Sequence, residues 1–375
     1  MQKLLCGLAG LATAFALAGG PALAQDTIKI GIINAYSGQF ADTGIQLDNG
    51  IKLYVKQHGD MVAGKKLEFI RKDVGGVAPD LAKRLAQELI VRDHADIFAG
   101  FVLTPNALAV ADISAEAKKF MVVMNAATSI ITTKSPYIAR TSTTTPQLNQ
   151  TLGTWAAKKG VKTAYTMVSD HGPGIDAEAA FHTGFKEAGG QIVGSVRFPV
   201  TNPDFSAFVQ RAKDANPDAI YIWIPGGAQP AAVGKALAER GIDPAKVKVM
   251  GQDSLAFESA RKSMGEIALG IITVSNYDSN IDTPLNHEFV KAYNEEFHRN
   301  PDIYSIGGYD GTRLIYEALI AAAKGMNWES PRGPITIDPE TRDVIQTVHI
   351  FQVEKVGDQL LNVEIDKVEN VKDPA

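Results

Sequence analysis

A regular alternation of strand and helix patterns constrains this chain more than any other feature of its sequence. Residues 27–33 form an apolar strand pattern, and in residues 45–58 the side chains of Leu47, Ile51 and Tyr54 recur at helical spacing. The same succession continues through strand or helix patterns at 66–73, 79–93, 95–100, 106–119 and 120–124. Such alternation predicts a parallel sheet with helices packed on both of its faces.

The alternation stops at Thr141–Pro146, where hydroxyl residues and a proline interrupt it, and then it begins again. The second run has strand or helix patterns at 163–170, 174–189, 191–198, 203–216, 218–224, 228–241 and 246–251. Two consecutive runs of this kind predict an α/β fold with two doubly wound parallel-sheet lobes.

The C-terminal part of the chain follows a different pattern. Residues 286–299 and 304–325 have helical spacing, whereas residues 333–365 alternate as in a β-hairpin. These segments must pack on one lobe or the other. If the helices and the hairpin join different lobes, the chain crosses between the lobes more than once.

Residues 1–24 are predicted to be a cleaved signal peptide. Lys3 supplies a positive start, residues 4–18 are apolar, and Ala22–Ala24 offers a small-residue cleavage site. A membrane anchor is the alternative, but the apolar stretch is rich in Gly and Ala and is too short to span a bilayer. The only cysteine of the chain, Cys6, lies inside this segment, too early for a lipoprotein anchor. We therefore expect an exported, soluble mature chain without disulfides or thiolate metal sites.

Composition and motifs exclude several classes of function. The chain has 42 acidic and 37 basic residues and no dense Lys/Arg run, so no nucleic-acid partner is expected. It contains no Walker loop, no G-x-S-x-G and no H-E-x-x-H, and residues 224–234 approach a dinucleotide fingerprint without its spacing. The seven histidines show no metal-ligand spacing. We therefore predict no cofactor, no metal and no catalytic constellation.

The loops that follow the predicted strands share a composition. They contain small residues, hydroxyls and amides, and each leads into a helix N-terminus; they span 34–44, 100–107, 125–131, 169–175, 224–230 and 251–257. Ligands of open parallel sheets bind at the carboxyl ends of the strands. Free N–H groups and hydroxyls suit a carboxylate, because charge-assisted hydrogen bonds return about 1.5–3 kcal/mol each. These loops are therefore predicted to hold a small carboxylate.

Each candidate residue in these loops also has a purely structural interpretation. Helix capping would account for Thr104, Thr128, Ser129 and Asp253, a half-buried core position for Tyr36, a solvated loop for His171, and a turn for Gly226–Gly227. The functional interpretation depends on their shared position at strand ends, not on any one of them.

Several segments resemble one family of proteins. Residues 28–55 (IKIGIINAYSGQFADTGIQLDNGIKLYV) and 125–147 (NAATSIITTKSPYIARTSTTTPQ) are similar to segments of the periplasmic solute-binding proteins of ABC importers, of the branched-chain amino-acid-binding type. Residues 205–222 and 308–324 are also similar to this family. No single motif is diagnostic, but order and spacing agree over essentially the whole chain after the signal peptide.

The resemblance implies a fold and a set of partners. It implies two lobes joined by three crossovers and closing like a hinge, the first lobe at 26–144 plus 277–331 and the second at 145–276 plus 332–375. It also implies a periplasmic monomer that binds a small-molecule carboxylate and serves membrane permease and ATPase subunits.

The resemblance also implies roles for particular residues. The loops after the third and fourth strands would hold the ligand carboxylate, through Thr104 or Asn106 and through Ala126 and Thr128. Tyr36 and Phe40 fall in the first contact loop. Asp253 occupies the loop in which amino-acid binders of this type hold the ligand ammonium.

The chain departs from the amino-acid binders at two places. Residues 102–108 (VLTPNAL) replace a serine run, and Pro173 stands where a tyrosine is common. The segments 125–142, 300–310 and 330–335 instead resemble a branch of the family that binds aromatic carboxylates such as hydroxybenzoates. The likeness favours an aromatic acid over a branched-chain amino acid, with Asp253 serving a phenol hydroxyl or only capping a helix.

The predicted ligand-binding residues are Tyr36, Phe101, Thr104, Asn106, Ala126, Thr128, His171, Pro173, Trp223, Gly226 and Asp253. In this interpretation the ring of the ligand packs against Tyr36, Phe101 or Trp223. A ligand sensor with the same fold and an exported enzyme using His171 or Asp253 remain the alternatives.

Overall fold

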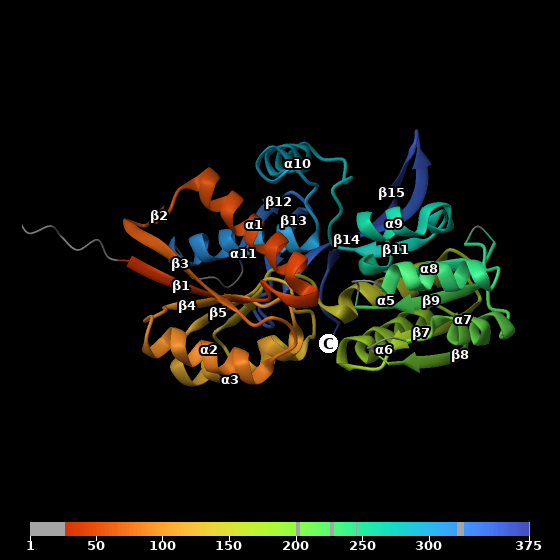
Figure 1. The fold of residues 1–375 in the computed structure, drawn as a ribbon, viewed down its shortest axis with the longest axis horizontal. Coiled ribbons are helices and arrows are strands. Elements are labelled where there is room, and N and C mark those ends of the chain that lie inside the picture. Colours follow the sequence, from red (N-terminus) through yellow and green to blue (C-terminus); the bar gives the residue numbers. More distant parts are fainter. Residues whose placement is uncertain (1–26, 200–202, 226–228, 245, 321–325, 375) are drawn as a thin grey trace, which may run out of the picture.

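The computed structural model describes residues 27–199, 203–225, 229–244, 246–320 and 326–374 of the chain. The predicted signal peptide, residues 1–24, and the predicted site residue Gly226 lie outside the described residues. The described chain forms two lobes that lie side by side, with β14 between them (Figure 1).

The first lobe is built on a six-stranded sheet with the order β2-β3-β1-β4-β5-β6. Its strands are β1 (Thr27–Asn34), β2 (Met61–Val62), β3 (Lys65–Asp73), β4 (Ile97–Gly100), β5 (Phe120–Val123) and β6 (Ile138–Arg140). Neighbouring strands are parallel except β2 and β3. Its helices include α1 (Ala41–His58), α2 (Pro79–Val91), α3 (Thr104–Ala117) and the short α4 (Ile130–Thr133). The strands β4 (IFAG) and β5 (FMVV) read as continuous apolar runs because helices cover both faces of the sheet, whereas β3, nearer its edge, carries several charged residues.

The second lobe is built on a nine-stranded sheet with the order β12-β13-β14-β11-β10-β9-β7-β8, and β15 pairs with β14. Its parallel strands are β7 (Thr163–Ser169), β8 (Gln191–Phe198), β9 (Ala219–Trp223), β10 (Lys248–Gln252) and β11 (Ile272–Ser275). Its antiparallel strands are β12 (Asn327–Ser330), β13 (Gly333–Ile337), β14 (Val344–Val356) and β15 (Gln359–Val371). Its helices are α5 (Thr145–Lys158), α6 (Gly172–Glu187), α7 (Phe205–Asp214), α8 (Gln229–Glu239) and α9 (Glu258–Met264).

Two late helices, α10 (Pro284–Phe297) and α11 (Ile303–Ile320), return to the first lobe. Glycines let α11 lie close against α1. A Cβ atom on Gly50 would lie 1.9 Å from the Ser305 carbonyl oxygen, and one on Gly308 would lie 2.0 Å from that of Leu47. Any larger side chain at either glycine would push the two helices apart.

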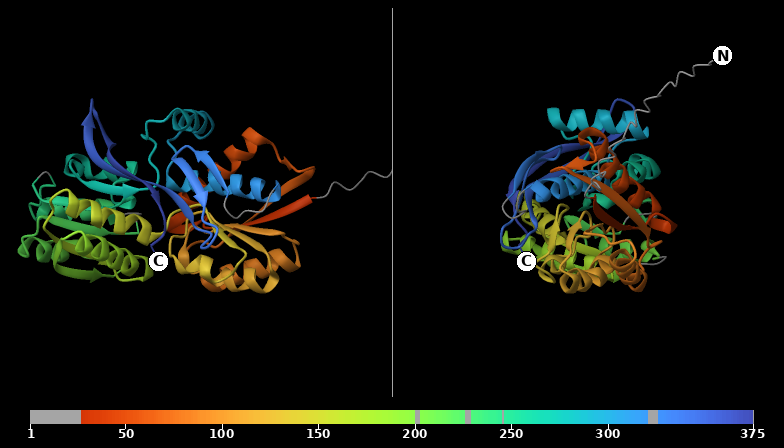
Figure 2. Two further views of the ribbon diagram at one scale, coloured as in Figure 1. Left: turned by 180° about the vertical axis from the view of Figure 1, so that it is seen from behind. Right: turned by 90° about the vertical axis from the view of Figure 1, so that its left-hand side faces the viewer.

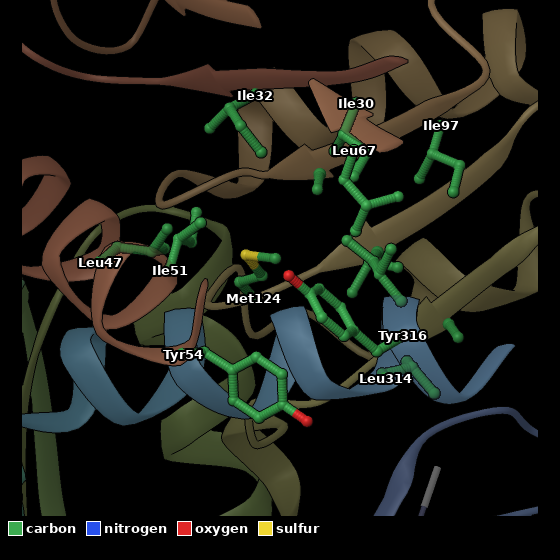
Figure 3. Close-up of a cluster of buried hydrophobic side chains, with 14 of the residues drawn as sticks. Ile30, Ile32, Leu47, Ile51, Tyr54, Leu67, Ile97, Met124, Leu314 and Tyr316 are labelled. Atoms are coloured by element: carbon green, nitrogen blue, oxygen red, sulfur yellow. The ribbon is translucent and has the colours of Figure 1, made fainter. Parts of the chain in front are cut away.

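The core of the first lobe explains why α11 belongs there. Ile30 and Ile32 of β1, Leu47 of α1 and Leu314 of α11 meet in one buried cluster (Figure 3).

No helix in the described ranges is both long and apolar enough to cross a membrane.

The strand β14 passes from one lobe to the other. Its first residue, Val344, packs in the first-lobe core together with Trp328 and Ile335, whereas Val348 and Ile350 pack in a second-lobe core. The end of β15 also lies beside the junction of the lobes (Figure 2). The predicted lobe boundary between residues 331 and 332 thus falls inside the hairpin β12–β13, which packs on the first lobe.

Two features of the fold differ from the pattern expected from the sequence. The helix α5 begins at Thr145, inside the predicted break at Thr141–Pro146, and continues through a stretch without a predicted element. The second sheet is mixed and not purely parallel, because β14 joins β11 in antiparallel orientation and extends the sheet with the predicted hairpin.

Candidate ligand site between the lobes

A cleft of about 500 Å³ lies between the two lobes. On the first lobe its lining comes from the segment after β1, which includes Phe40, and from the connection between α10 and α11. On the second lobe it comes from the ends of strands: Pro225 follows β9, Asp253 follows β10 and Tyr277 follows β11. The carboxyl edges of the two sheets therefore face each other across this cleft. Because ligands of open parallel sheets bind at this edge, the cleft is the candidate ligand site.

Two contacts join the lobes across the cleft. The Asn300 side chain of the first lobe donates a hydrogen bond of 3.2 Å to Glu258 of α9. The rings of Tyr304 and Phe257 lie 6.2 Å apart in an edge-on arrangement. These four residues also line the cleft.

The 125–130 loop, which follows β5, is held from inside the first lobe by Arg140. The side chain of Arg140 is fully buried. Its Nη1 donates to the carbonyl oxygen of Ala126 at 2.8 Å, and its Nη2 donates to that of Thr128 at 2.8 Å. A longer contact of 3.5 Å reaches the carbonyl oxygen of Ser129. Three carbonyl groups of this loop therefore point at one guanidinium group.

The other side of these peptide units carries unpaired donors. In a trans peptide the C=O and N–H groups point in opposite directions, and none of the described peptide bonds is cis. The N–H groups of Ala127, Ser129 and Ile130 therefore point away from Arg140, and none of them donates to another described residue. The hydroxyl of Thr128 lies 3.2 Å from that of Thr104. Several N–H groups and hydroxyls in one short loop suit an anion.

Three other predicted residues of the first lobe are already engaged. The Asn106 amide donates to the Gly76 carbonyl at 2.8 Å and accepts from the Ala78 N–H at 2.9 Å, so it holds that loop. The Ala126 N–H, expected to face the ligand, donates to the Phe101 carbonyl at 2.9 Å. Phe101 itself is a core residue, with 1% of its surface exposed.

Tyr36 turns its hydroxyl toward the first lobe. The hydroxyl lies 3.4 Å from Asp48 Oδ1, which also receives the Arg71 guanidinium at 2.7 Å. Burial and the Asp48 carboxylate both raise the pKa of Tyr36, so the phenol stays neutral. Its backbone N–H donates to Asp73 at 2.8 Å, which fixes the start of the loop after β1.

An aromatic pair marks the matching edge of the second lobe. The rings of His171 and Trp223 lie 5.4 Å apart. The Trp223 indole N–H donates to Gln252 Oε1 at 2.8 Å, and the same oxygen accepts from Asn149 at 3.1 Å. Asn149 in turn accepts from the Tyr221 hydroxyl at 2.6 Å. Since an indole can only donate, this chain of hydrogen bonds assigns the orientation of both amides.

His171 and Pro173 lie at the start of α6. His171 is the N-cap residue, and its Nδ1 lies 3.1 Å from the Ser169 hydroxyl. Burial lowers the pKa of His171, so the imidazole is neutral at pH 7. Pro173 is half-buried in the first turn of the helix.

Asp253 lines the cleft and also begins a short 3-10 helix, Asp253–Leu255. Its carboxylate accepts from the Ser275 hydroxyl at 3.0 Å and from the Ser254 N–H at 2.6 Å. Burial raises the pKa of Asp253 to about 7. The side chain thus has a position in the cleft that suits a ligand contact, whereas the N-cap residue of this short helix is Gln252 and not Asp253.

Sequence reasoning missed two residues that organise this region, Arg140 and Gln252. An arginine that ends an apolar strand pattern, as in residues 137–140 (YIAR), is the signal that could have identified Arg140.

Within the described ranges, no three His, Cys, Asp or Glu side chains are grouped so as to hold a metal ion.

Comparisons with known proteins agree with this architecture. Residues 27–358 match the family model described as periplasmic binding protein. The Leu/Ile/Val-binding protein homolog 6 of Brucella melitensis biotype 1 is 38% identical over 375 residues, which cover 96% of each chain.

Two solved structures are similar in both sequence and fold. A solute-binding protein of an ABC transporter from Rhodopseudomonas palustris BisB5, in complex with 3,4-dihydroxybenzoic acid, is 49% identical with a TM-score of 0.88, covering 93% of this chain and 99% of that chain. Another from R. palustris, in complex with 4-hydroxybenzoate, is 40% identical with a TM-score of 0.88, covering 93% and 98%. The predicted fold class and family are confirmed by these matches. This chain belongs to the periplasmic binding protein family.

Proposed function

We propose that this protein binds a small aromatic carboxylate, such as a hydroxybenzoate, between its lobes and delivers it to an ABC importer. The observation that carries this proposal is the 125–130 loop. It presents three N–H groups that have no partner among the described residues, and the Thr128 hydroxyl, at the carboxyl edge of a parallel sheet. A carboxylate accepts several hydrogen bonds at once, which is what this loop supplies.

The energetics of a carboxylate at this loop are favourable. Removing a carboxylate from water costs several kcal/mol, and an uncompensated buried charge is not tolerated. Hydrogen bonds to a charged group return about 1.5–3 kcal/mol each, so three N–H groups and a hydroxyl offset the loss. The buried Arg140 holds the inner side of the same loop, with its own charge paired by Asp343.

The second lobe favours a ring over an ammonium group. Trp223 and His171 are neutral aromatic side chains, suited to an aromatic ligand. An amino acid would need an ionised carboxylate for its ammonium, and the raised pKa of Asp253, about 7, weakens that partner. A partly protonated Asp253 suits a phenol hydroxyl, because it can donate or accept a hydrogen bond. The two relatives in complex with hydroxybenzoates support the same ligand class.

An amino-acid ligand is the second candidate. It is favoured by the similarity to the Leu/Ile/Val-binding protein homolog 6 and by the position of Asp253 in the cleft. In both cases the protein binds its ligand without chemical change. Export by the predicted signal peptide, a periplasmic location, a monomeric state and membrane permease and ATPase partners complete the proposal. The family supports the periplasmic location, and the ABC-transporter relatives support the transporter partners.

Isothermal titration calorimetry tests the ligand class directly. The mature chain is titrated separately with 4-hydroxybenzoate, 3,4-dihydroxybenzoate and leucine, after unfolding and refolding to remove any bound ligand. We expect saturable binding of both hydroxybenzoates and none of leucine. Heat from leucine alone would overturn the aromatic proposal. Chromatography of the ligand after long incubation should recover it unchanged, whereas a new product would indicate an enzyme.

A further inference from the structure

The guanidinium group of Arg140 has a second partner besides the carbonyl groups of the 125–130 loop. Its Nε lies 2.7 Å from Asp343 Oδ1, and the two side chains are 0% and 4% exposed. A fully buried arginine is tolerated only where its charge is paired and its N–H groups have acceptors. Asp343 supplies the charge, and the loop carbonyls supply acceptors.

Asp343 lies in the connection between β13 and β14, directly before the strand that passes into the second lobe. Its other carboxylate oxygen accepts from the Thr132 hydroxyl at 2.8 Å. The neighbouring Arg342 donates from its side chain to the Thr132 carbonyl at 2.6 Å, and its own carbonyl accepts from the Arg140 N–H at 3.1 Å. The base of the 125–130 loop is thus bonded to this connection at several points.

The direction of the loop N–H groups depends on this arrangement. If the guanidinium were absent, the carbonyls of Ala126 and Thr128 would lose their donor. Buried carbonyls without a donor are costly, so their peptide units would rotate toward other donors or water. The N–H groups of Ala127 and Ser129, on the opposite side of those peptide units, would rotate with them.

We propose that Arg140, anchored by Asp343, is the positioning residue that sets the carboxylate-binding conformation of the 125–130 loop. The proposal rests on the proposed function, since it concerns how the same site selects an anionic ligand. Arg140 acts through the peptide units and does not touch the ligand itself. Its contribution is to orient several backbone donors toward one point.

A second buried pair provides a matched control. Arg332 and Asp310 are 1% and 0% exposed, and Arg332 Nε lies 3.0 Å from Asp310 Oδ2. Arg332 also donates to Gln346 and to the carbonyl of Thr141. It therefore braces the same junction between the lobes with the same chemistry, but it makes no hydrogen bond to the 125–130 loop.

The experiment compares two double variants, Arg140→Met/Asp343→Leu and Arg332→Met/Asp310→Leu. Each replaces a buried ion pair by apolar groups, which avoids leaving one charge unpaired. Binding of 4-hydroxybenzoate and of 4-hydroxybenzyl alcohol, which keeps the ring but lacks the carboxylate, is measured below the melting temperature of each variant. We expect the preference for the carboxylate over the alcohol to fall at least tenfold in the Arg140 variant and to persist in the Arg332 variant.

Arg140→Lys keeps a buried cation and covers the case in which a double variant does not fold. An ammonium group cannot reach the loop carbonyls with the fork geometry of a guanidinium, so the carboxylate preference should be intermediate. An unchanged preference in both Arg140 variants, or an equal loss for the acid and the alcohol, would overturn the proposal as a merely structural effect.

Hydrogen exchange without ligand separates this inference from the proposed function. The Ala126 N–H bonds to the Phe101 carbonyl, and the Ile131 N–H bonds to that of Thr128, so both amides report on the loop. Their exchange should be at least tenfold faster in the Arg140 variants and unchanged in the Arg332 variant. If the wild type binds no aromatic carboxylate, the proposed function fails, while faster exchange still supports Arg140 as the residue that sets the loop. Unchanged exchange would contradict it.

Discussion

The carboxyl edges of the two sheets carry different chemistry. On the first lobe the donors are backbone N–H groups and the hydroxyls of Thr104 and Thr128, with a buried guanidinium behind them. On the second lobe the groups are rings, with Trp223 fixed by Gln252. The first-lobe groups are suited to a negative charge, and the second-lobe groups are suited to an apolar ring. A ligand that has both parts would contact both lobes, and such a ligand favours the closed state.

The largest expected effect comes from the ring on the second lobe. Replacing Trp223 by Ala removes the aromatic surface and leaves Gln252 without its indole donor. We expect the affinity for 4-hydroxybenzoate to fall about 100-fold, corresponding to about 2.8 kcal/mol. Trp155→Ala is the matched control, because Trp155 lies on α5 with its indole bonded to Asp366 at 3.0 Å. It should lower stability but leave the affinity within about twofold; a similar loss in both variants would contradict a contact specific to Trp223.

A smaller but still large effect is expected from the hydroxyl on the first lobe. Thr128→Val keeps the shape of the side chain and removes its oxygen. If this hydroxyl holds the carboxylate, calorimetry should show a loss of more than tenfold, about 1.4 kcal/mol or more. Thr133→Val is the control, since the Thr133 hydroxyl donates to the Ile130 carbonyl of its own helix at 2.8 Å. An unchanged affinity in Thr128→Val would show that the Thr128 hydroxyl does not hold the carboxylate and that the residue has only a structural role.

The sequence could predict that these two edges would face each other, but not which groups would be free. Strand patterns placed residues 125–131 and 251–257 after strands, and topology then brings strand ends together. Which N–H groups lack partners depends instead on the orientation of single peptide units. That orientation is set by Arg140, whose anchor Asp343 lies 203 residues further along the chain (343 − 140). The family resemblance pointed to Ala126, and the structure shows that the N–H of this residue donates to the Phe101 carbonyl.

Long-range packing also decides which lobe the hairpin β12–β13 covers, and a sequence pattern does not show such packing. The hairpin β12–β13 has the alternation of any strand pair, so its pattern does not say which lobe it covers. The structure shows that Trp328 and Ile335 bury their side chains in the first-lobe core, while the hydrogen bonds of β13 extend the second sheet. The hydrogen bonds of this hairpin therefore belong to the second-lobe sheet, whereas its buried side chains belong to the first-lobe core.

A pH-dependent effect is expected from Asp253 on the second lobe. Its pKa is raised to about 7 by burial, with Asp302 and Asp278 nearby, against an unfolded value of about 3.9. Between pH 4 and pH 7 the folded chain holds a proton that the unfolded chain lacks, so the free energy of unfolding falls as the pH rises through this window. Asp253→Asn should remove that fall and gain roughly 1–3 kcal/mol over the wild type at pH 8, with little gain at pH 4.

Urea unfolding at pH 4, 6 and 8 measures this difference. Asp302→Asn is the comparison on the first lobe, because burial raises the pKa of Asp302 to about 6. The fall in the free energy of unfolding that Asp302 causes should therefore be complete about one pH unit lower than the fall that Asp253 causes. Equal gains from Asp253→Asn at pH 4 and pH 8 would show that Asp253 is ionised in the folded chain throughout.

The smallest effects come from two phenol hydroxyls, and they sharpen the contrast between the lobes most directly. Tyr36→Phe removes a hydroxyl that faces Asp48, and we expect the affinity for 4-hydroxybenzoate to stay within about twofold. Tyr221→Phe removes the 2.6 Å hydrogen bond to Asn149, which in turn holds the amide of Gln252 beside Trp223. Loss of one such bond should weaken binding roughly three- to fivefold, about 0.6–1 kcal/mol, without contact between Tyr221 and the ligand. The reverse order, with Tyr36 the more sensitive, would place the ring of the ligand on the first lobe and remove the division of chemistry between the two edges.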